Sequence, residues 1–463
     1  MYPADLPPAD IAAQDLPAEV RLVRVDVPDL PGALATSRHG SVLAAPPDDP
    51  RLRWRPEPVP EIDSVVADGA IAALDATPWH DAGYRGQGVH VAVFDLQWQD
   101  LDLYTEELGE FTTHDCFAHR SCGPEINSIN PASRSEFGSH GVACAEVIHD
   151  IAPDARLSLV RVSGLTSLEN AVDWAIRNEV DVISMSLSYF NESFYEGLGP
   201  VNAVMDELSA AGVLMVTSAG NYATEHHWDH FEDRDRDGVH DFPGQGGQAL
   251  PIEWGAGTQR INLIWDDFGN CGDTDLDLYV YNEAGDLVGR SREVQVPGGG
   301  EDGQDCQPVE RATVNAAEAG WYYAVVHHAG GVPATRFDIM ARSGNVWQGR
   351  PEGSITDPGN HPSVFTVGAV RADGYLRNGA EEFSSEGPTH AGLPKPDIAG
   401  PDGLSTAIYG PRGFFGTSAA TPCGRGRDRP VDERGPPADR AGRSRSLAWR
   451  GRGRGGHLGG CRR

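Results

Sequence analysis

Short apolar strands alternate with amphipathic helices in this 463-residue chain, and this alternation constrains its fold more than any other feature. It runs through residues 88–221 and returns at residues 361–370. Strands joined through helices lie parallel, and a parallel sheet needs helices on both faces, so we predict an α/β fold of this kind. The expected strands span residues 88–95, 155–162, 181–188, 212–221 and 361–370, and the expected helices span residues 138–153, 167–180 and 201–211.

A different pattern interrupts this alternation. Residues 224–258 are polar and suggest a loop, and residues 260–342 show only short strand patterns separated by Gly-rich turns. This spacing is typical of a small β-sandwich, so we predict an all-β domain inserted into the α/β domain. In DLDLYVY, Leu276, Leu278 and Val280 share one face and should be core. Asp273, Asp275 and Asp277 share the opposite face, where solvated surface is the simpler interpretation and a cation site the alternative.

The two ends of the chain have their own composition. The N-terminal region is rich in Pro and Ala with one strand pattern at residues 19–27, and suggests a pro-segment remnant or an irregular arm. The last 41 residues hold 12 Arg and 10 Gly without periodicity, which suggests translation in a wrong reading frame or, alternatively, a basic tail for an acidic partner. The predicted division is an arm (1–75), a first catalytic part (76–225), an insert (226–345), a second catalytic part (346–422) and a non-native tail (423–463).

Charge excludes one class of function. The chain has 68 acidic and 37 basic residues and a net charge of -31, which argues against nucleic-acid binding, since phosphate requires a basic surface. It suits a protein that collects divalent cations. No apolar run is long enough to span a membrane, and the N-terminal residues lack the basic and apolar regions of a secretory signal. This pattern predicts either a protein that is not exported or a sequence that lacks its true start.

Seven cysteines are too few for a scaffold built on disulfides. Cys116 and Cys122 are close in sequence, and Cys271 with Cys306 could close one small domain. Two such disulfides would indicate an oxidising compartment, whereas reduced, buried thiols would indicate the cytosol. Cys144 is expected in the core.

Three segments together indicate nucleophilic catalysis. GTSAATP places Ser418 at a possible helix start, GSHGVACAEVI places His140 near another, and VAVFD places Asp95 at the carboxyl end of a buried strand. A serine nucleophile needs a base to accept its proton, and the base needs a carboxylate to orient it. Asp95 and His140 are 45 positions apart, and His140 and Ser418 are 278 apart, including the insert.

These motifs resemble those of the subtilases, the subtilisin-like serine proteases. GTSAATP, SHG, TSAGN, KPDIAGP, FSSEGP and DVISMSLS occur in the order of that family. The resemblance covers residues 78–225 and 345–422 and implies a subtilisin-like sheet, with Asp95, His140 and Ser418 as a triad in a serine endopeptidase. The segment DTDLDLYVYN followed by GWYYAVVHH resembles the pre-peptidase C-terminal type of β-sandwich found beside secreted bacterial proteases.

The resemblance also implies roles around the triad. Asn221 and the Ser418 N–H would bind the oxyanion, and a protein or peptide substrate would pair as an extended strand along Ser186, Leu187 and Ser188. It implies a secreted enzyme.

Several positions depart from the family pattern. Leu96 and Gln97 follow the aspartate, Val142 and Ala143 follow the HG pair, and Ser188 replaces a glycine. The family also continues beyond Pro422 with an apolar helix, which CGRGRDRPVDERGPP cannot form. We therefore expect this exact chain to be weakly active or inactive; the alternative is a non-catalytic binding or adhesion protein derived from a subtilase.

An acidic loop suggests a calcium site. In EDRDRDGVHDF, the expected oxygen ligands stand at alternate positions and are Asp233, Asp235, Asp237 and Asp241. Gly238 would allow the tight turn between them. It resembles the first half of an EF-hand loop. Gly244 stands where a bidentate Glu would close the site, so a solvated acidic loop is the alternative. Calcium would have a structural role.

Overall fold

The computed structural model describes most of the chain between residues 70 and 424. The described residues are 70–117, 122–124, 126, 138–242, 247–268, 274–295, 308–331, 336–375 and 377–424, with the backbone of three strands near the N-terminus. These strands are β1 (Tyr2–Pro3), β2 (Val20–Val27) and β3 (Leu30–Ser37), and β2 confirms the strand predicted there. Residues 425–463 of the Arg/Gly-rich tail lie outside the described residues, as do Gly244, Cys271, Asp273 and Cys306.

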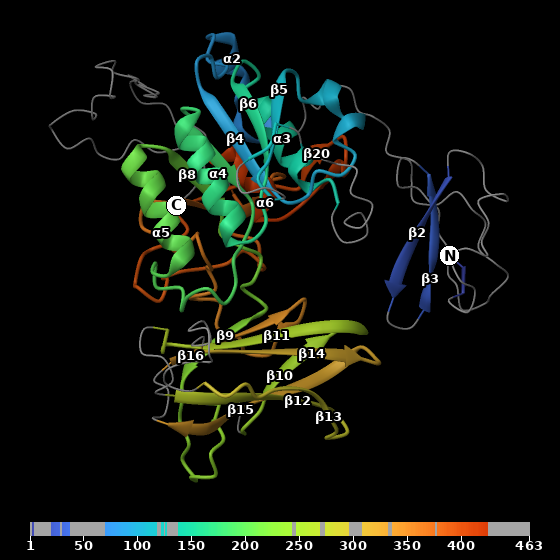
Figure 1. Cartoon of the computed structure of the whole chain (residues 1–463), viewed down its shortest axis with the longest axis vertical. Coiled ribbons are helices and arrows are strands. Elements are labelled where there is room, and N and C mark those ends of the chain that lie inside the picture. Colours follow the sequence, from blue (N-terminus) through green and yellow to red (C-terminus); the bar gives the residue numbers. More distant parts are fainter. Residues whose placement is uncertain are drawn as a thin grey trace.

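A seven-stranded sheet forms the α/β part of the chain, in the order β19-β18-β8-β7-β4-β6-β5 (Figure 1). Every neighbouring pair in it is parallel, which confirms the predicted fold class. The strands are β4 (His90–Asp95), β5 (Phe111–Asp115), β6 (Arg156–Arg161), β7 (Val182–Met185), β8 (Leu214–Ser218), β18 (Phe365–Arg371) and β19 (Ile398–Asp402). The sequence did not predict β5 and β19, because FTTHD and IAGPD contain no apolar run.

Helices cover both faces of this sheet. On β4, Val91 and Val93 pack into one core, which includes α3 (His140–Ile151). Ala92 and Phe94 point the other way into a second core. That core includes α4 (Leu165–Arg177) and α5 (Pro200–Ala211), so all three predicted helices are present. The shorter elements are α1 (Ala70–Leu74), α2 (Thr77–Asp81), η1 (Leu101–Leu103), η2 (Thr105–Glu107), β20 (Leu404–Thr406), β21 (Gly410–Phe414), α6 (Thr417–Ala420) and η4 (Thr421–Cys423).

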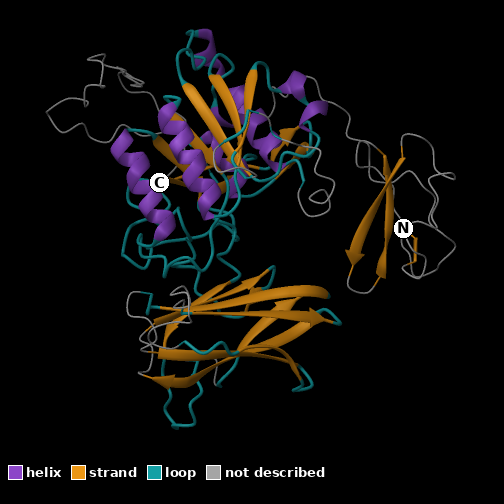
Figure 2. Cartoon of the chain, viewed as in Figure 1, coloured by secondary structure: helices purple, strands orange, loops and turns teal. Residues whose placement is uncertain are grey.

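Two antiparallel sheets lie between β8 and β18 in the chain. Their orders are β13-β12-β15-β10-β17 and β14-β11-β16-β9, and they pack around one apolar core that includes Leu276, Leu278 and Val280, as predicted. Figure 2 shows helices only beside the parallel sheet. The strands are β9 (His226–His230), β10 (Leu250–Trp254), β11 (Gly257–Trp265), β12 (Thr274–Asn282), β13 (Leu287–Ser291), β14 (Val309–Ala316), β15 (Gly320–Gly331), β16 (Arg336–Arg342) and β17 (Asn345–Val346).

The prediction of a loop over residues 224–258 was wrong, because β9 and β10 lie in it. The side chains that β9 buries are His226, His227 and Asp229. Polar side chains in the buried positions hide the apolar alternation by which a strand is normally recognised.

The chain enters and leaves this two-sheet unit side by side. The N–H of Arg350 donates to the carbonyl of His226 over 3.0 Å, and the N–H of Val346 donates to that of Thr224 over 2.8 Å. Two adjacent segments of the chain, hydrogen-bonded to each other, therefore join the two-sheet unit to the parallel sheet. Among the described residues, none of the helices has both the length and the apolar character needed to cross a membrane.

Candidate active site

Asp95 is the last residue of β4 and lies at the carboxyl edge of the sheet. Its Oδ1 accepts the backbone N–H of Gln97 over 2.9 Å, and its Oδ2 lies 2.7 Å from Nδ1 of His140. The carboxylate is almost fully buried, so both contacts hold it in one orientation. Residue 97 takes part in these contacts through its backbone: its N–H reaches Asp95, and its carbonyl oxygen accepts the Gly141 N–H over 2.9 Å.

His140 is the first residue of α3 and contacts Asp95 through Nδ1. A carboxylate oxygen only accepts, so Nδ1 carries the hydrogen and the Nε2 lone pair is free to take a proton. Burial opposes the charged form, but Asp95 and the Cys144 thiol outweigh it and raise the pKa of His140 well above 6.5. The pair thus has the arrangement of an oriented general base.

Gly141 lets α3 approach β4 closely. A Cβ at this position would lie 2.7 Å from Cβ of Asp95 and 3.0 Å from a ring carbon of Trp98. Both neighbours are buried and cannot move away. The glycine that follows the histidine in SHG is therefore required for the contact between His140 and Asp95.

Ser418 lies in α6, directly after a sharp turn at Gly416. Its carbonyl oxygen accepts the Ser186 hydroxyl over 3.3 Å and lies 3.9 Å from Sγ of Cys144, which is itself 4.0 Å from Nδ1 of His140. The backbone of Ser418 and the ring of His140 thus lie on either side of the Cys144 sulfur. In the described part of the chain, no hydrogen bond joins the Ser418 hydroxyl to His140. Such contacts often tighten only when substrate binds.

Asn221 follows β8 and reaches the start of α6. Its Oδ1 accepts the N–H and the hydroxyl of Thr417, over 2.9 and 3.0 Å. Because the Thr417 N–H can only donate, the end of the Asn221 carboxamide that faces it is the oxygen. The two N–H bonds of Nδ2 are then directed toward another acceptor. Gly416 (φ 103°) leaves room for this amide, since a Cβ there would lie 3.0 Å from Nδ2. Buried Asp402 accepts the Gly416 N–H over 3.1 Å; no local pattern in the sequence had indicated this contact.

The predicted substrate edge continues β7 past the end of the sheet. Ser186 is buried beside Ser418, and Leu187 packs against the core beneath α4 and α5. Ser188 follows in the same extended segment. The three residues thus begin beside the candidate nucleophile.

The acidic loop brings three of its four aspartates together. Oxygens of Asp233, Asp235 and Asp237 lie within 4.8 Å of one another. Asp233 also accepts the N–H groups of Arg236, Asp237 and Gly238, over 2.6 to 3.1 Å, which curls the loop around its carboxylate. Asp241 lies outside this group and accepts the N–H of Arg234. Carboxylate oxygens in this arrangement fit Ca²⁺, which prefers oxygen ligands.

A cavity of about 1640 Å³ lies away from these residues. It borders β8, β18 and β19 and is lined by Val213, Leu214, Phe365 and Ile398 among others. Asp95, His140 and Ser418 do not line it. The size of a cavity is therefore a poor guide to the candidate active site of this chain.

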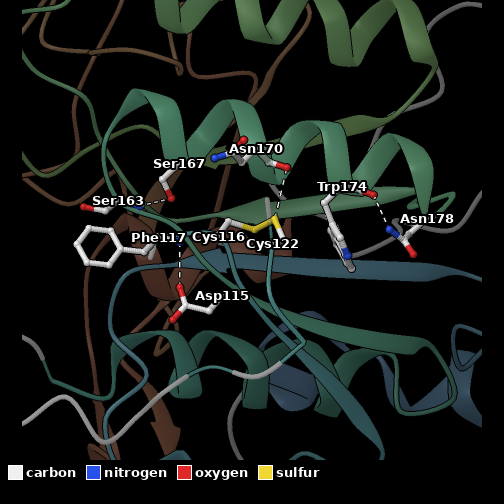
Figure 3. Close-up of a disulfide and its surroundings, with 9 residues drawn as sticks. All are labelled: Asp115, Cys116, Phe117, Cys122, Ser163, Ser167, Asn170, Trp174 and Asn178. Carbon is white, nitrogen blue, oxygen red and sulfur yellow. Dashed lines mark hydrogen bonds between the residues drawn. A yellow bond between two sulfur atoms is a disulfide. The ribbon is translucent and has the colours of Figure 1, made fainter. Parts of the chain in front are cut away.

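Cys116 and Cys122 form a disulfide next to α4, as predicted (Figure 3). Sγ of Cys122 lies 3.4 Å from the carbonyl oxygen of Asn170 on that helix. The disulfide closes the loop after β5 against α4. Cys144 and Cys423 are buried and take part in no disulfide.

An α/β protein with a parallel seven-stranded sheet, an Asp–His pair and a serine at a helix start has the architecture of the subtilisin-like class. Comparison with known proteins agrees. The sequence model of the Subtilase family matches residues 86–255. Subtilisin E of Bacillus subtilis (strain 168) is 28% identical over 162 residues, which are 33% of this chain and 39% of that protein. The subtilisin-like protease het-Q2 of Podospora anserina is 33% identical over 102 residues, 20% of this chain and 28% of that protein.

Among solved structures, the CspB protease of Clostridium perfringens is similar with a TM-score of 0.49 and 16% identity, covering 76% of this chain and 85% of that one. The chain spans about two fifths of the length of Subtilisin E and other curated subtilisins that it matches. Over residues 86–255 the chain is therefore similar to the subtilase family.

Proposed function

We propose that this protein is a serine endopeptidase whose triad is Asp95, His140 and Ser418. The observation that carries the proposal is the 2.7 Å contact between Asp95 and Nδ1 of His140, which leaves Nε2 free beside the element that holds Ser418. Protein or peptide substrates follow from this chemistry, with the chain bound in an extended form along Ser186, Leu187 and Ser188.

The proposed reaction has two halves. The Ser418 hydroxyl attacks the scissile carbonyl while His140 takes its proton, and Asp95 stabilises the imidazolium. The negative oxygen of the tetrahedral intermediate accepts hydrogen bonds from Nδ2 of Asn221 and the N–H of Ser418. His140 then gives its proton to the leaving amine, and an acyl-enzyme forms at Ser418. Water, activated by the same histidine, releases the acid product and restores the serine.

A fluorophosphonate probe tests this proposal in the full chain. We expect covalent labelling on the peptide that contains Ser418, loss of labelling in Ser418→Ala, and a large decrease in His140→Ala. We expect labelling to be slower than that of Subtilisin E, because no apolar helix pattern follows Pro422. A folded chain, with a native near-ultraviolet circular dichroism spectrum, that took up no label would contradict the proposal and favour a non-catalytic binding protein.

We further propose that Asp233, Asp235 and Asp237 bind a structural Ca²⁺, with Asp241 as an additional ligand. The clustered oxygens of the first three and the Gly238 turn (φ 87°) support it. Calcium would stabilise the acidic loop against the repulsion of its own carboxylates. Ca²⁺ should raise the melting temperature of the chain relative to excess EGTA, and Asp235→Asn should reduce that difference. An equal difference in both proteins would contradict the assignment.

We also propose that the protein is secreted. The Cys116–Cys122 disulfide supports this, since such disulfides persist in oxidising compartments. Detection of the protein in the medium of its native host, with both thiols protected from alkylation, tests this directly.

A further inference from the structure

Three metal-ligating side chains meet between the two-sheet unit and the α/β part of the chain. They are His226 on β9, Asp338 on β16 and His390 in the segment before β19. Nε2 of His226 lies 3.3 Å from Oδ2 of Asp338, and Nε2 of His390 lies 2.8 Å from the same oxygen. The side chains are 0, 2 and 4% exposed. The sheet that contains β9 and β16 is the one that faces the α/β part (Figure 1).

The hydrogen bonding of His226 assigns its tautomer. Its Nδ1 lies 2.6 Å from the carbonyl oxygen of Arg350, which can only accept, so Nδ1 carries the hydrogen. In the neutral ring, Nε2 then presents a lone pair. This atom is fully buried and has no hydrogen-bond partner, although it points toward Asp338. A lone pair facing a carboxylate is unfavourable unless a cation lies between them.

A neighbouring group of side chains shows the contrast. His240 lies 3.8 Å from Asp229, but its Nδ1 accepts the N–H of Glu232 over 3.0 Å. The hydrogen is therefore on Nε2, which presents an N–H and no lone pair to Asp229. The Arg350 guanidinium, 3.5 Å away, balances the Asp229 carboxylate. Asp229 thus has an Arg beside it, whereas the carboxylate of Asp338 has two imidazole nitrogens and no Arg or Lys paired with it among the described residues.

We propose that His226, Asp338 and His390 bind a Zn²⁺ ion. Two imidazoles and one carboxylate are ligands that Zn²⁺ favours, and Ca²⁺ would prefer oxygens alone. Bonds of about 2.0 Å in a tetrahedron place neighbouring ligand atoms about 3.3 Å apart. The distance from His226 to Asp338 already has this value. Nε2 of His390 lies within hydrogen-bonding distance of both carboxylate oxygens of Asp338, at 2.8 and 2.9 Å, so it gives up its proton and moves away as the ion enters.

The surroundings match those of a zinc site. The Arg350 carbonyl orients His226 through its second nitrogen, as outer ligands of metal-bound histidines do. The ring of Phe194 stacks on His390 with centroids 4.8 Å apart and holds it from the other side. Since two ligands come from the two-sheet unit and the third from residue 390, the ion links that unit to the α/β part. These three side chains leave the fourth position of the tetrahedron to a water molecule, and the role of the ion is to hold the two parts together.

Cobalt titration of the full chain, after dialysis against EDTA, tests the site. We expect one Co²⁺ per chain with the strong visible absorption of a four-coordinate ion, without a thiolate charge-transfer band, and displacement by Zn²⁺. Asp338→Asn and His390→Asn should each weaken zinc binding at least ~100-fold, since even outer partners cost ~10–100-fold. The matched control is His361→Asn, a buried histidine 3.3 Å from Asp206 and outside the site.

Two results would overturn the proposal. One is a natively folded full chain that binds neither Co²⁺ nor Zn²⁺ above the level of an EDTA-treated blank. The other is a spectrum and zinc affinity that Asp338→Asn leaves unchanged. Because the first result needs no variant, the proposal stays testable even if both substitutions prevent folding.

Discussion

Oδ1 of Asn221 accepts two hydrogen bonds from Thr417, one from the backbone N–H and one from the hydroxyl. Thr417 immediately precedes Ser418, so the asparagine on one side of the site and the serine on the other are held by the same residue. The carboxamide cannot rotate without breaking both bonds. Its Nδ2 is therefore oriented before any substrate arrives, which is the condition for stabilising a developing charge.

Replacing Asn221 by Ala should lower kcat far more than it raises KM, because the amide would act on the transition state. The expected loss is about 100- to 1000-fold, the range that subtilisins themselves show on losing this kind of donor. Hydrolysis of a chromogenic peptide measures it. Asn282→Ala, on the surface of the two-sheet unit, is the control. A loss confined to KM would contradict the role.

The rate of labelling by the fluorophosphonate probe should depend on pH through His140. The base must be neutral, and Asp95 and Cys144, despite burial, raise its pKa well above 6.5. Labelling should therefore fall as the pH decreases through that raised pKa, with a midpoint above 6.5. Asp95→Asn should move the midpoint to lower pH. A midpoint at or below that of a free histidine would show that Asp95 does not hold the imidazole.

Gly141→Ala should damage the site without removing any proposed catalytic group. The added Cβ would come within 2.7 Å of Asp95 and push α3 away from β4. Overpacking of this kind costs roughly 1–3 kcal/mol of stability. We expect a lower free energy of unfolding in urea and slower labelling of Ser418. Gly255→Ala, at an exposed position where a Cβ meets nothing within 4 Å, should change neither.

Glu146 should make the protein less stable as the pH rises. Burial raises the pKa of this carboxyl from 4.5 to about 8, while the Ala407 N–H partly opposes the shift. Between these values the unfolded chain is ionised and the folded chain keeps its proton, so unfolding becomes easier with increasing pH, by about 1.4 kcal/mol per pH unit. The stabilising contribution of the protonated carboxyl is fully present below pH 4.5 and is lost above about pH 8.

Glu146→Gln tests this by removing the ionisation and keeping an oxygen for Ala407. The difference between its unfolding free energies at pH 5 and pH 8 should be smaller than that of the unsubstituted chain. Glu169→Gln, an exposed position on α4, is the control and should leave the difference unchanged. Equal slopes in all three proteins would show that Glu146 is ionised in the folded state.

Removing the disulfide should destabilise the protein. Cys116 and Cys122 are six positions apart, and closing so short a loop contributes roughly 2 kcal/mol through the unfolded chain. The double variant Cys116→Ser/Cys122→Ser should lose this amount in urea denaturation. The variant Phe117→Ala, next to Cys116, changes the local packing and keeps the disulfide. It therefore tests whether the loss of stability comes from the covalent link or from packing. A double variant as stable as the unsubstituted chain would contradict the prediction.

The sequence predicted the parallel sheet because its central strands are buried on both faces and need continuous apolar runs. It also predicted the candidate triad, since Asp95, His140 and Ser418 each stand in a short motif whose neighbours have a local role. Gly141 and Gly416 are examples of such neighbours. Neither has a Cβ, which at residue 141 would collide with Asp95 and at residue 416 with Asn221.

The rest depends on contacts that no local pattern encodes. His226, Asp338 and His390 come from positions up to 164 residues apart (390 minus 226) and share no spacing rule. Asp402 supports Gly416 through one backbone hydrogen bond that requires the folded sheet. The strand β9 was missed for the same reason, because its histidines are buried by partners elsewhere in the chain.

The paired segments at Thr224–Val346 and His226–Arg350 have a consequence for how the chain folds. The cost in entropy of bringing β8 and β18 together grows slowly with the length of chain between them, and in this protein that chain forms its own core with its ends in contact. Once the two-sheet unit has folded, β8 and β18 are separated by little more than a short connection. The parallel sheet can then assemble at nearly the rate of a protein without the insert, and the unit could be exchanged in evolution for another with adjacent ends.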